Sequence, residues 1–203
     1  MTQANSHSDI DNCLYPKSES PPTSLPEPQP LLTIPGARVH DLMKDLIGRY
    51  FHEHLSLPWE EAVRLHREYY QSYGLAIEGL VRHHQIDPLE YNAKVDDALP
   101  LDGVIKPRDE LKKLLGDIDR SKVKLWLLTN AYINHAKRVV RLLEVEEFFD
   151  GVTYCDYSQV PLVCKPQREM YEKAMREAGV ERFEDCYFVG EYPLLVHMAD
   201  YVA

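Results

Sequence analysis

Apolar residues divide the chain into a helical part and a later part in which strands and helices alternate. From residue 39 onward, apolar side chains recur at spacings of three and four, which is typical of a helix with one buried face. The residues of this stripe are Val39, Leu42, Met43, Leu46, Ile47 and Tyr50. Three further helical segments are predicted at 58–71, at 75–84 and from Pro88 onward. Four successive helices without a convincing strand indicate a small helical module.

After Gly103, short apolar runs alternate with amphipathic helices. The clearest strand covers residues 123–128 and ends at Thr129-Asn130, and further strands are predicted at 152–155 and 186–189. Three helices that alternate with these strands are marked by apolar faces: Leu111, Leu114, Leu115 and Ile118; Ile133, Ala136, Val140 and Leu143; and Met170, Tyr171, Ala174, Met175 and Ala178. Gly179 is expected to end the last of them. Such alternation predicts a parallel sheet with helices on its faces.

These patterns predict an α/β protein whose Rossmann-like parallel sheet carries an inserted all-helical cap. The core is assigned to residues 1–18 and 101–203, and the cap to residues 37–100. Residues 19–36 contain six of the fourteen prolines, and proline lacks a backbone donor and blocks helix continuation. We therefore expect a loop insertion there, with a proline-motif ligand for a partner domain as the alternative.

Composition narrows the classes of partner. The net charge of −10 provides no basic excess for a nucleic-acid polymer, although a small anionic substrate needs only a few local donors. No apolar run is long enough to span a membrane, and residues 1–8 lack the apolar core of a secretion signal. The four cysteines form no C-x-x-C pair, so reduced thiols in a cytoplasmic protein, or one that is also nuclear, are expected.

Polar side chains with possible chemistry occur near the N-terminus and after the first clear strand. Asp9 and Asp11 lie two residues apart, so in an extended segment they point the same way and can share a cation or a substrate. Thr129 and Asn130 stand where a strand gives way to a helix. Their hydroxyl, amide and nearby helix N–H groups suit a phosphate, and they suit a helix cap equally well.

Two further candidates follow later in the chain. Lys165 precedes Pro166, which suits the first turn of the next helix, so the lysine is expected at a helix entrance. Glu191 follows the last predicted strand, where its carboxylate could reach a metal ion. Taken singly, a lysine or an acidic residue at such a place is usually a solvated charge, and only the order of all the candidates makes a pattern.

That order resembles the four motifs of the haloacid dehalogenase-like hydrolases. The motifs are matched by Asp9 with Asp11, by Thr129, by Lys165 and by an acid after the last strand. The surrounding words DIDNCLYPKS, LLTNAYINHAKRVV, FFDGVTYCDYS, CKPQREMYEKAM and CYFV resemble the pyrimidine 5′-nucleotidases of fungi and plants. The helical segment that contains YYQSYGLAIEGL resembles the cap of that branch.

The resemblance implies a Mg²⁺-dependent phosphatase of nucleoside 5′-monophosphates, with a pyrimidine base preferred. Asp9 would be the nucleophile that forms an aspartyl-phosphate, and Asp11 the general acid and base. Thr129 and Asn130 would hold phosphoryl oxygens, and Lys165 would balance the negative charge that accumulates there. Asp9, the backbone carbonyl of Asp11, and Glu191 would bind Mg²⁺.

The chain also departs from the family pattern at both ends of the core. The residues before Asp9 are polar, so the usual buried first strand is expected to be missing. Gly190-Glu191 stands where family members carry neighbouring aspartates. The core is therefore expected to be incomplete at its edges. Two alternatives stay open: a phosphatase of another small phosphate ester, and a catalytically impaired member of the same family.

Overall fold

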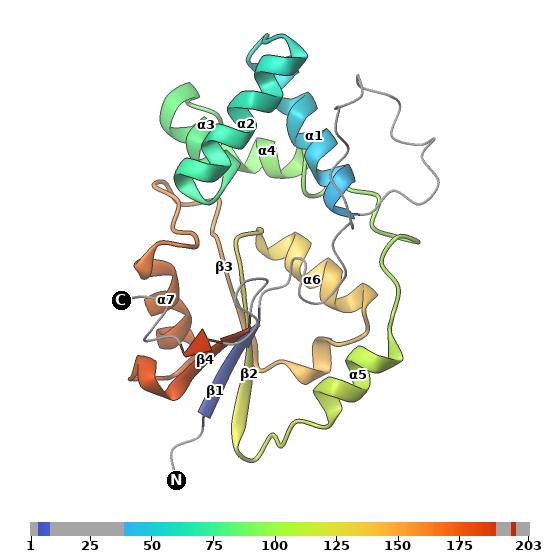
Figure 1. Ribbon diagram of the computed structural model, residues 1–203, viewed down its shortest axis with the longest axis vertical. Helices are drawn as coiled ribbons and strands as arrows, with labels where there is room; N and C mark the ends of the chain where they lie inside the picture. The colour runs from blue at the N-terminus through green and yellow to red at the C-terminus, as the bar shows by residue number, and fades with distance from the viewer. Residues whose placement is uncertain (1–3, 9–38, 190–195, 198–203) are drawn as a thin grey trace. The chain divides into compact units, whose positions relative to one another are not determined.

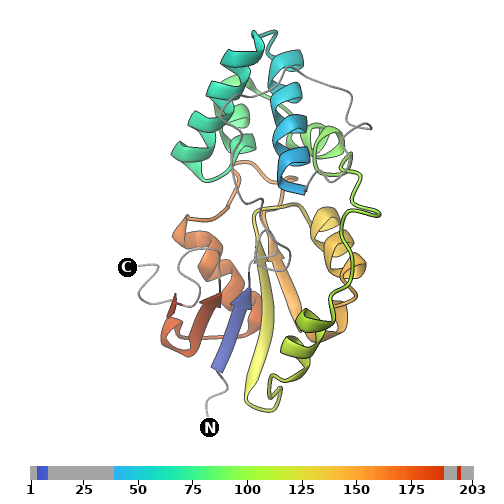
Figure 2. The ribbon, with the colours of Figure 1, turned by 45° about the vertical axis from the view of Figure 1, so that its right-hand side comes forward.

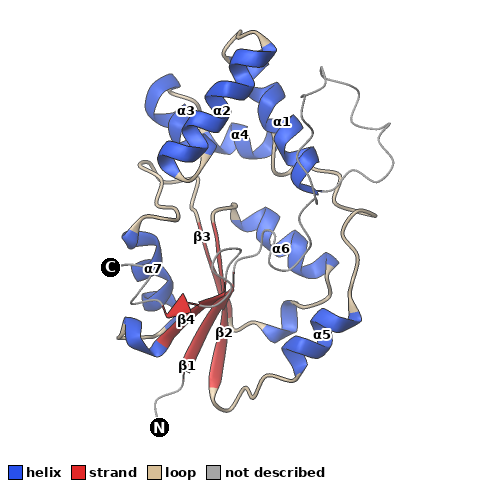
Figure 3. Cartoon of the chain, viewed as in Figure 1, coloured by secondary structure: helices blue, strands red, loops and turns tan. Residues whose placement is uncertain are grey.

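The structure, a computed structural model, describes residues 4–8, 39–189 and 196–197, which fall into two compact units. The core unit contains the described residues of 4–8, 105–156, 163–189 and 196–197. The helical unit contains residues 39–104 and 157–162. Figure 3 shows that every described strand belongs to the core unit. The segment 157–162 thus clusters with the helical unit, although it lies in the part of the chain that the sequence assigns to the core.

The core unit is built on a sheet of five strands in the order β3-β2-β1-β4-β5 (Figure 1). The strands are β1 (Ala4–Ser8), β2 (Val123–Thr129), β3 (Gly151–Tyr154), β4 (Cys186–Val189) and β5 (Val196–His197). β1 pairs in parallel with β2 and β4, β2 pairs in parallel with β3, and β5 pairs antiparallel with β4. The predicted α/β class is confirmed. Four parallel strands present their carboxyl ends at one edge, where ligands bind in such sheets.

β1 lies at the centre of this sheet, so the prediction that the first strand is missing was wrong. In register, Ala4–Ser8 runs beside Val123–Leu127, and residues 5–8 run beside Cys186–Val189. Apolar composition is the usual sign of a central strand, and ANSHS does not have it. Two parallel neighbours offer backbone donors and acceptors to any sequence, because the ladder is made by main-chain groups alone.

Three helices of the core unit pack on the two faces of the sheet. They are α5 (Asp109–Gly116), α6 (Ile133–Leu142) and α7 (Arg168–Ala178), with short 3₁₀ turns at Glu146–Phe148 and Phe183–Asp185. Figures 1 and 2 show α5 and α6 on one face and α7 on the other. The chain steps outward from β2 to β3 and then back across the sheet to β4. Right-handed crossovers in opposite directions place their helices on opposite faces.

The packing of these helices confirms most of the predicted apolar faces. α7 buries Met170, Tyr171, Ala174 and Met175 in one cluster with Leu128, Cys186 and Phe188. It ends at Gly179, whose φ of 72° is in the left-handed region that glycine adopts without strain. The predicted face of α5 was partly wrong. Leu115 is buried, whereas Leu114 is 63% exposed, and the helix ends before Ile118.

The helical unit consists of α1 (Val39–His54), α2 (Trp59–Tyr73), α3 (Ala76–His84) and α4 (Pro88–Lys94). Its most deeply buried apolar residues include Phe51, Ile77, Leu80, Leu99 and Leu101. Two local signals set the helix bounds. Gly74 ends α2 with a φ of 76°, and Asp87 caps α4 by accepting a 2.9 Å hydrogen bond from the Leu89 amide. In the part of the chain that the structure describes, no helix has the length and apolar character needed to cross a bilayer.

Replacing Gly79 by alanine is expected to destabilise the helical unit by about 1–3 kcal/mol. An added Cβ would lie 2.2 Å from Cγ and 2.7 Å from Cβ of Tyr69. These atoms form the base of a buried side chain whose hydroxyl contacts His84 Nε2 at 2.7 Å, so the ring cannot turn away without moving α2. Urea unfolding followed by circular dichroism would measure the loss.

The matched control is Gly116→Ala in α5, where the new Cβ would come no closer than 3.7 Å to the Phe148 ring. This variant is expected to keep the urea midpoint or to raise it slightly, since alanine favours helix. If Gly79→Ala kept the midpoint as well, the close contact between α2 and α3 would not constrain the unit.

Candidate active site

The site begins where β2 ends. Thr129 is the last residue of this strand and is fully buried. Its Oγ1 accepts a 3.0 Å hydrogen bond from the amide of Ala131, which stabilises the turn after the strand. This bond uses the oxygen as an acceptor, and the hydroxyl proton can still be donated to an anion. α6 begins only at Ile133, with Tyr132 at its N-cap position, so the alternative that Thr129 or Asn130 caps this helix was wrong.

Asn130 holds the backbone of Lys165 by two hydrogen bonds. The Lys165 amide donates to Oδ1 at 2.7 Å, and Nδ2 donates to the Lys165 carbonyl at 3.0 Å. The chain after β2 is thus joined to the chain before α7. Lys165 was expected at a helix entrance, and this was wrong, because α7 begins at Arg168 with Gln167 at its N-cap position.

The ammonium group of Lys165 contacts two strands that are not neighbours. Nζ donates to the carbonyl of Leu128 in β2 at 3.3 Å, and it lies 5.7 Å from the ring centroid of Phe188 in β4. β1 lies between β2 and β4, and its last residue, Ser8, is in register with Leu127 and Val189. A cation that touches both neighbours at this level therefore lies near the carboxyl end of β1.

Three of the six predicted site residues are brought together by the structure, namely Thr129, Asn130 and Lys165. The other three are Asp9, Asp11 and Glu191, which lie outside the described residues. The sequence nevertheless relates two of them to described strands. Asp9 follows directly on the last residue of β1, and Glu191 comes two residues after the end of β4. Within the described ranges, no group of three or more His, Cys, Asp and Glu residues is arranged to hold a metal ion.

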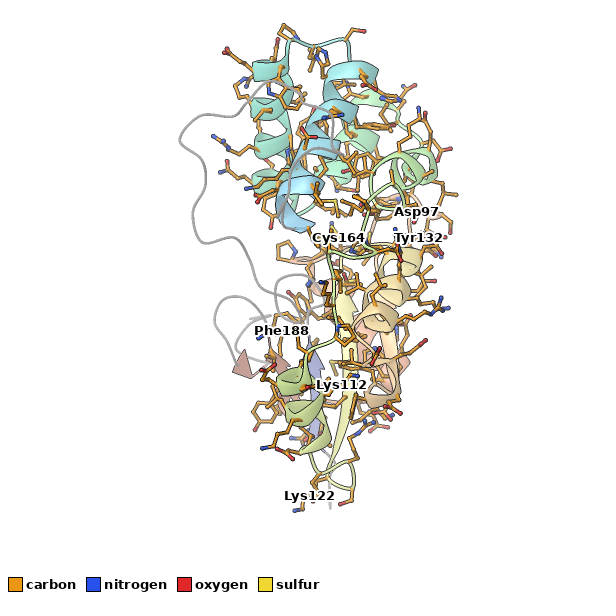
Figure 4. All side chains as sticks on the ribbon, turned by 90° about the vertical axis from the view of Figure 1, so that its right-hand side faces the viewer. Asp97, Lys112, Lys122, Tyr132, Cys164 and Phe188 are labelled. Atoms are coloured by element: carbon orange, nitrogen blue, oxygen red, sulfur yellow. The ribbon has the colours of Figure 1, made fainter. Side chains whose placement is uncertain are left out.

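Two tyrosines at the same edge of the sheet were missed from the sequence. Tyr154 ends β3 and is in register with Thr129, while Tyr132 stands three residues after Thr129. Their ring centroids are 5.9 Å apart with the planes at 81°, a favourable edge-to-face contact. Figure 4 shows Tyr132 and Lys122 at opposite ends of β2. The predicted strand 152–155 ran one residue past Tyr154, so Tyr154 was not recognised as a strand end.

The Tyr154 phenol stays neutral at physiological pH. Burial is the main cause that raises its pKa, and the neighbouring Asp156, Tyr132 and Glu177 raise it further. Lys173 in α7 lies against the same residue: its Nζ donates to the Tyr154 carbonyl at 2.9 Å and lies 4.9 Å from the ring centroid. Tyr132 and Tyr154 together offer half-buried aromatic surface and a phenolic donor beside Thr129.

The cysteines that the structure describes are buried thiols, and the pKa of one of them is clearly raised. Cys155, Cys164 and Cys186 are free thiols and are buried, as the sequence predicts for reduced cysteines. Burial raises the pKa of the Cys186 thiol to about 11, so the thiolate that would be needed for attack is scarce near neutral pH.

Comparison with known proteins identifies the family. A family model described as haloacid dehalogenase-like hydrolase matches residues 8–191, which is most of the chain. The chain belongs to the haloacid dehalogenase-like hydrolases. The family resemblance predicted from the motif order is confirmed. Among curated proteins, phosphate metabolism protein 8 of Saccharomyces cerevisiae is 37% identical over 191 residues. The match covers 90% of this chain and 54% of the yeast protein, so the chain spans about half the length of this relative.

Solved structures of haloacid dehalogenase-like hydrolases share the fold. CbbY from Rhodobacter sphaeroides, in complex with xylulose-(1,5)bisphosphate, has a TM-score of 0.58 at 17% identity, covering 92% of this chain and 76% of CbbY. The putative hydrolase YfnB from Bacillus subtilis, bound to magnesium, has a TM-score of 0.54 at 10% identity, covering 100% of this chain and 86% of YfnB. At these identities the likeness concerns the fold alone.

Proposed function

We propose that the chain is a Mg²⁺-dependent phosphomonoester hydrolase that acts on nucleoside 5′-monophosphates, preferably pyrimidine ones, through an aspartyl-phosphate. The core unit would carry the chemistry, and the helices of residues 37–100 would form the cap over the nucleoside. The substrate would be a small phosphorylated molecule rather than a nucleic-acid polymer. Membership of the haloacid dehalogenase-like hydrolases supports this reaction class.

The observation that carries the proposal is the position of the Lys165 ammonium. It lies between β2 and β4, near the carboxyl end of β1, and Asp9 is the next residue of the chain after β1. Thr129 ends β2 at the same edge of the sheet. The ammonium of Lys165 and the hydroxyl of Thr129 thus lie close to the strand that Asp9 follows. This arrangement suits a reaction in which a carboxylate attacks a phosphate.

In the proposed reaction, a carboxylate oxygen of Asp9 attacks phosphorus and the ester oxygen leaves. Asp11 donates a proton to that leaving oxygen, so a nucleoside with a free hydroxyl departs. The same group then accepts a proton from water, which attacks the aspartyl-phosphate, releases phosphate and regenerates Asp9. The need to protonate the departing oxygen is the chemical reason for a second acid at residue 11.

The remaining residues bind and balance charge. The Thr129 hydroxyl donates to a phosphoryl oxygen, and Lys165 stabilises the negative charge of the transferring group. Mg²⁺ would be held by the Asp9 carboxylate, the Asp11 backbone carbonyl and Glu191, since the first two residues follow β1 and the third follows the neighbouring β4. When bound there, the ion would lower the repulsion between the phosphate and the attacking carboxylate.

The nucleotide preference is supported by the sequence words shared with pyrimidine 5′-nucleotidases. These include LLTNAYINHAKRVV, which spans the end of β2 and the start of α6, and the cap segment YYQSYGLAIEGL. The name of the yeast relative, phosphate metabolism protein 8, agrees with phosphate chemistry and says nothing of the base.

The test is release of inorganic phosphate from uridine, cytidine, adenosine and guanosine 5′-monophosphates and from ribose 5-phosphate. With millimolar Mg²⁺, we expect the pyrimidine nucleotides to be hydrolysed at least about tenfold more efficiently than the others, a discrimination that pocket contacts can supply. Removal of the ion with a chelator is expected to abolish release.

Two other outcomes would favour the alternatives. Equal rates for all the esters, or a preference for ribose 5-phosphate, would point to another small phosphate ester as substrate. No release from any ester, together with measurable binding of inorganic phosphate, would mark a catalytically impaired member of the family. Full activity in the chelator would exclude the proposed metal dependence.

A further inference from the structure

We propose that Asn130 is a positioning residue whose side chain anchors the catalytic lysine to the core unit. The role of Lys165 in this inference rests on the proposed function. The anchoring itself rests on the geometry of the two backbone hydrogen bonds between Asn130 and Lys165.

The two hydrogen bonds use both ends of the Asn130 amide. Oδ1 accepts from the Lys165 amide at 2.7 Å, and Nδ2 donates to the Lys165 carbonyl at 3.0 Å. A side-chain amide is planar with an acceptor and a donor side by side, so it matches the N–H and C=O of a single residue as a neighbouring strand would. Two contacts fix the orientation of that residue, whereas one contact leaves it free to rotate. The direction in which the Lys165 side chain leaves the backbone is thereby set.

The side chain of Lys165 contacts the same segment of the chain. Nζ donates to the Leu128 carbonyl, which lies two residues before Asn130 on the same strand end. The backbone and the ammonium group of Lys165 are therefore both held by the segment 128–130. A charge that is positioned before the substrate arrives needs no reorganisation during the reaction.

Lys165 needs such an anchor because the chain just before it belongs to the other unit. Residues 157–162 cluster with the helical unit, and the chain returns to the core unit at Val163. Only Val163 and Cys164 separate that segment from Lys165. Any displacement of the segment relative to the core would be passed along two residues of backbone to the lysine. The bonds to Asn130, which follows β2, hold Lys165 against this displacement.

The first measurement is hydrogen exchange of the Lys165 amide in the full chain. This readout does not depend on catalytic activity. Asn130→Ala removes its acceptor, and we expect exchange at Lys165 to become at least about fivefold faster, as loss of one hydrogen bond implies. Asn130→Asp keeps the acceptor and loses the donor, so it is expected to keep most of the protection while placing a carboxylate oxygen against the Lys165 carbonyl. The control is Asn134→Ala, an exposed asparagine of α6, which should leave exchange at Lys165 unchanged.

The second measurement is a double-mutant cycle on phosphate release with Asn130→Ala, Lys165→Ala and the pair. If Asn130 acts through Lys165, its loss costs about 10- to 100-fold in kcat in the presence of the lysine and almost nothing in its absence. The effect should fall mainly on kcat, because the ammonium acts on charge that develops in the transition state.

The outcomes separate the two claims. Additive losses in the cycle, or unchanged exchange at Lys165 in Asn130→Ala, would overturn the anchoring. Faster exchange in Asn130→Ala, in a protein whose unaltered form releases no phosphate from any ester, would keep the anchoring and overturn the proposed function.

Discussion

Asp9→Asn is expected to lower phosphate release by about 10⁴-fold or more, with the fold intact. An amide oxygen is a poor nucleophile and carries no charge to attack phosphorus, so the proposed aspartyl-phosphate cannot form. The measurement is the steady-state rate with uridine 5′-monophosphate and Mg²⁺, together with circular dichroism and thermal unfolding. The unfolding midpoint should stay close to that of the unaltered protein.

A matched control is available in α5, where Asp109 is an exposed carboxylate in the first turn. Asp109→Asn makes the same chemical change away from the site, and its rate should equal that of the unaltered protein. Full activity of Asp9→Asn would defeat the proposed mechanism, whatever the likeness to the haloacid dehalogenase-like hydrolases.

Lys165→Met is expected to reduce kcat by about 10²–10³-fold, with a smaller change in KM. Methionine preserves most of the volume and apolar stem of lysine and removes the ammonium that lies between Leu128 and Phe188. Lys165→Arg should not restore the rate, because a planar guanidinium cannot occupy the place of a compact ammonium group. Rates over a range of substrate concentrations separate kcat from KM.

The control for this variant is Lys137→Met, which removes an exposed lysine from α6 and leaves the site intact. We expect its kcat to be unchanged. A loss of less than about threefold in Lys165→Met would mean that the cation does not stabilise the transition state, and Lys165 would then be only a structural link between β2 and α7.

The alternation of strands and helices could be predicted from the sequence because apolar periodicity reflects burial directly. Residues 123–128 form most of β2, and Gly179 ends α7, as expected from an apolar run and from the conformational freedom of glycine. Attention to the carboxyl ends of strands also led to Thr129, which the structure brings close to Lys165. These features depend on local composition or on one general property of parallel sheets.

Features that depend on pairing could not be predicted in the same way. The strand β1 has no apolar pattern, and it is held in the sheet by backbone pairing with β2 and β4. The contact of Asn130 with Lys165 joins residues 35 positions apart, so the sequence near Asn130 gave no sign of it. Lys165 was placed at a helix entrance because Pro166 suits a first turn, whereas α7 starts two residues later.

The central place of β1 has a consequence for how the protein is made. This strand leaves the ribosome long before its partners, since residue 5 pairs with residue 186 on one side and with residue 124 on the other. During that delay its backbone N–H and C=O groups are unpaired and can bind other nascent chains. An apolar strand with unpaired backbone groups would be prone to aggregate. The polar stretch ANSHS is well hydrated before it pairs. A composition that looks unsuited to the middle of a sheet therefore lowers the tendency to aggregate during synthesis.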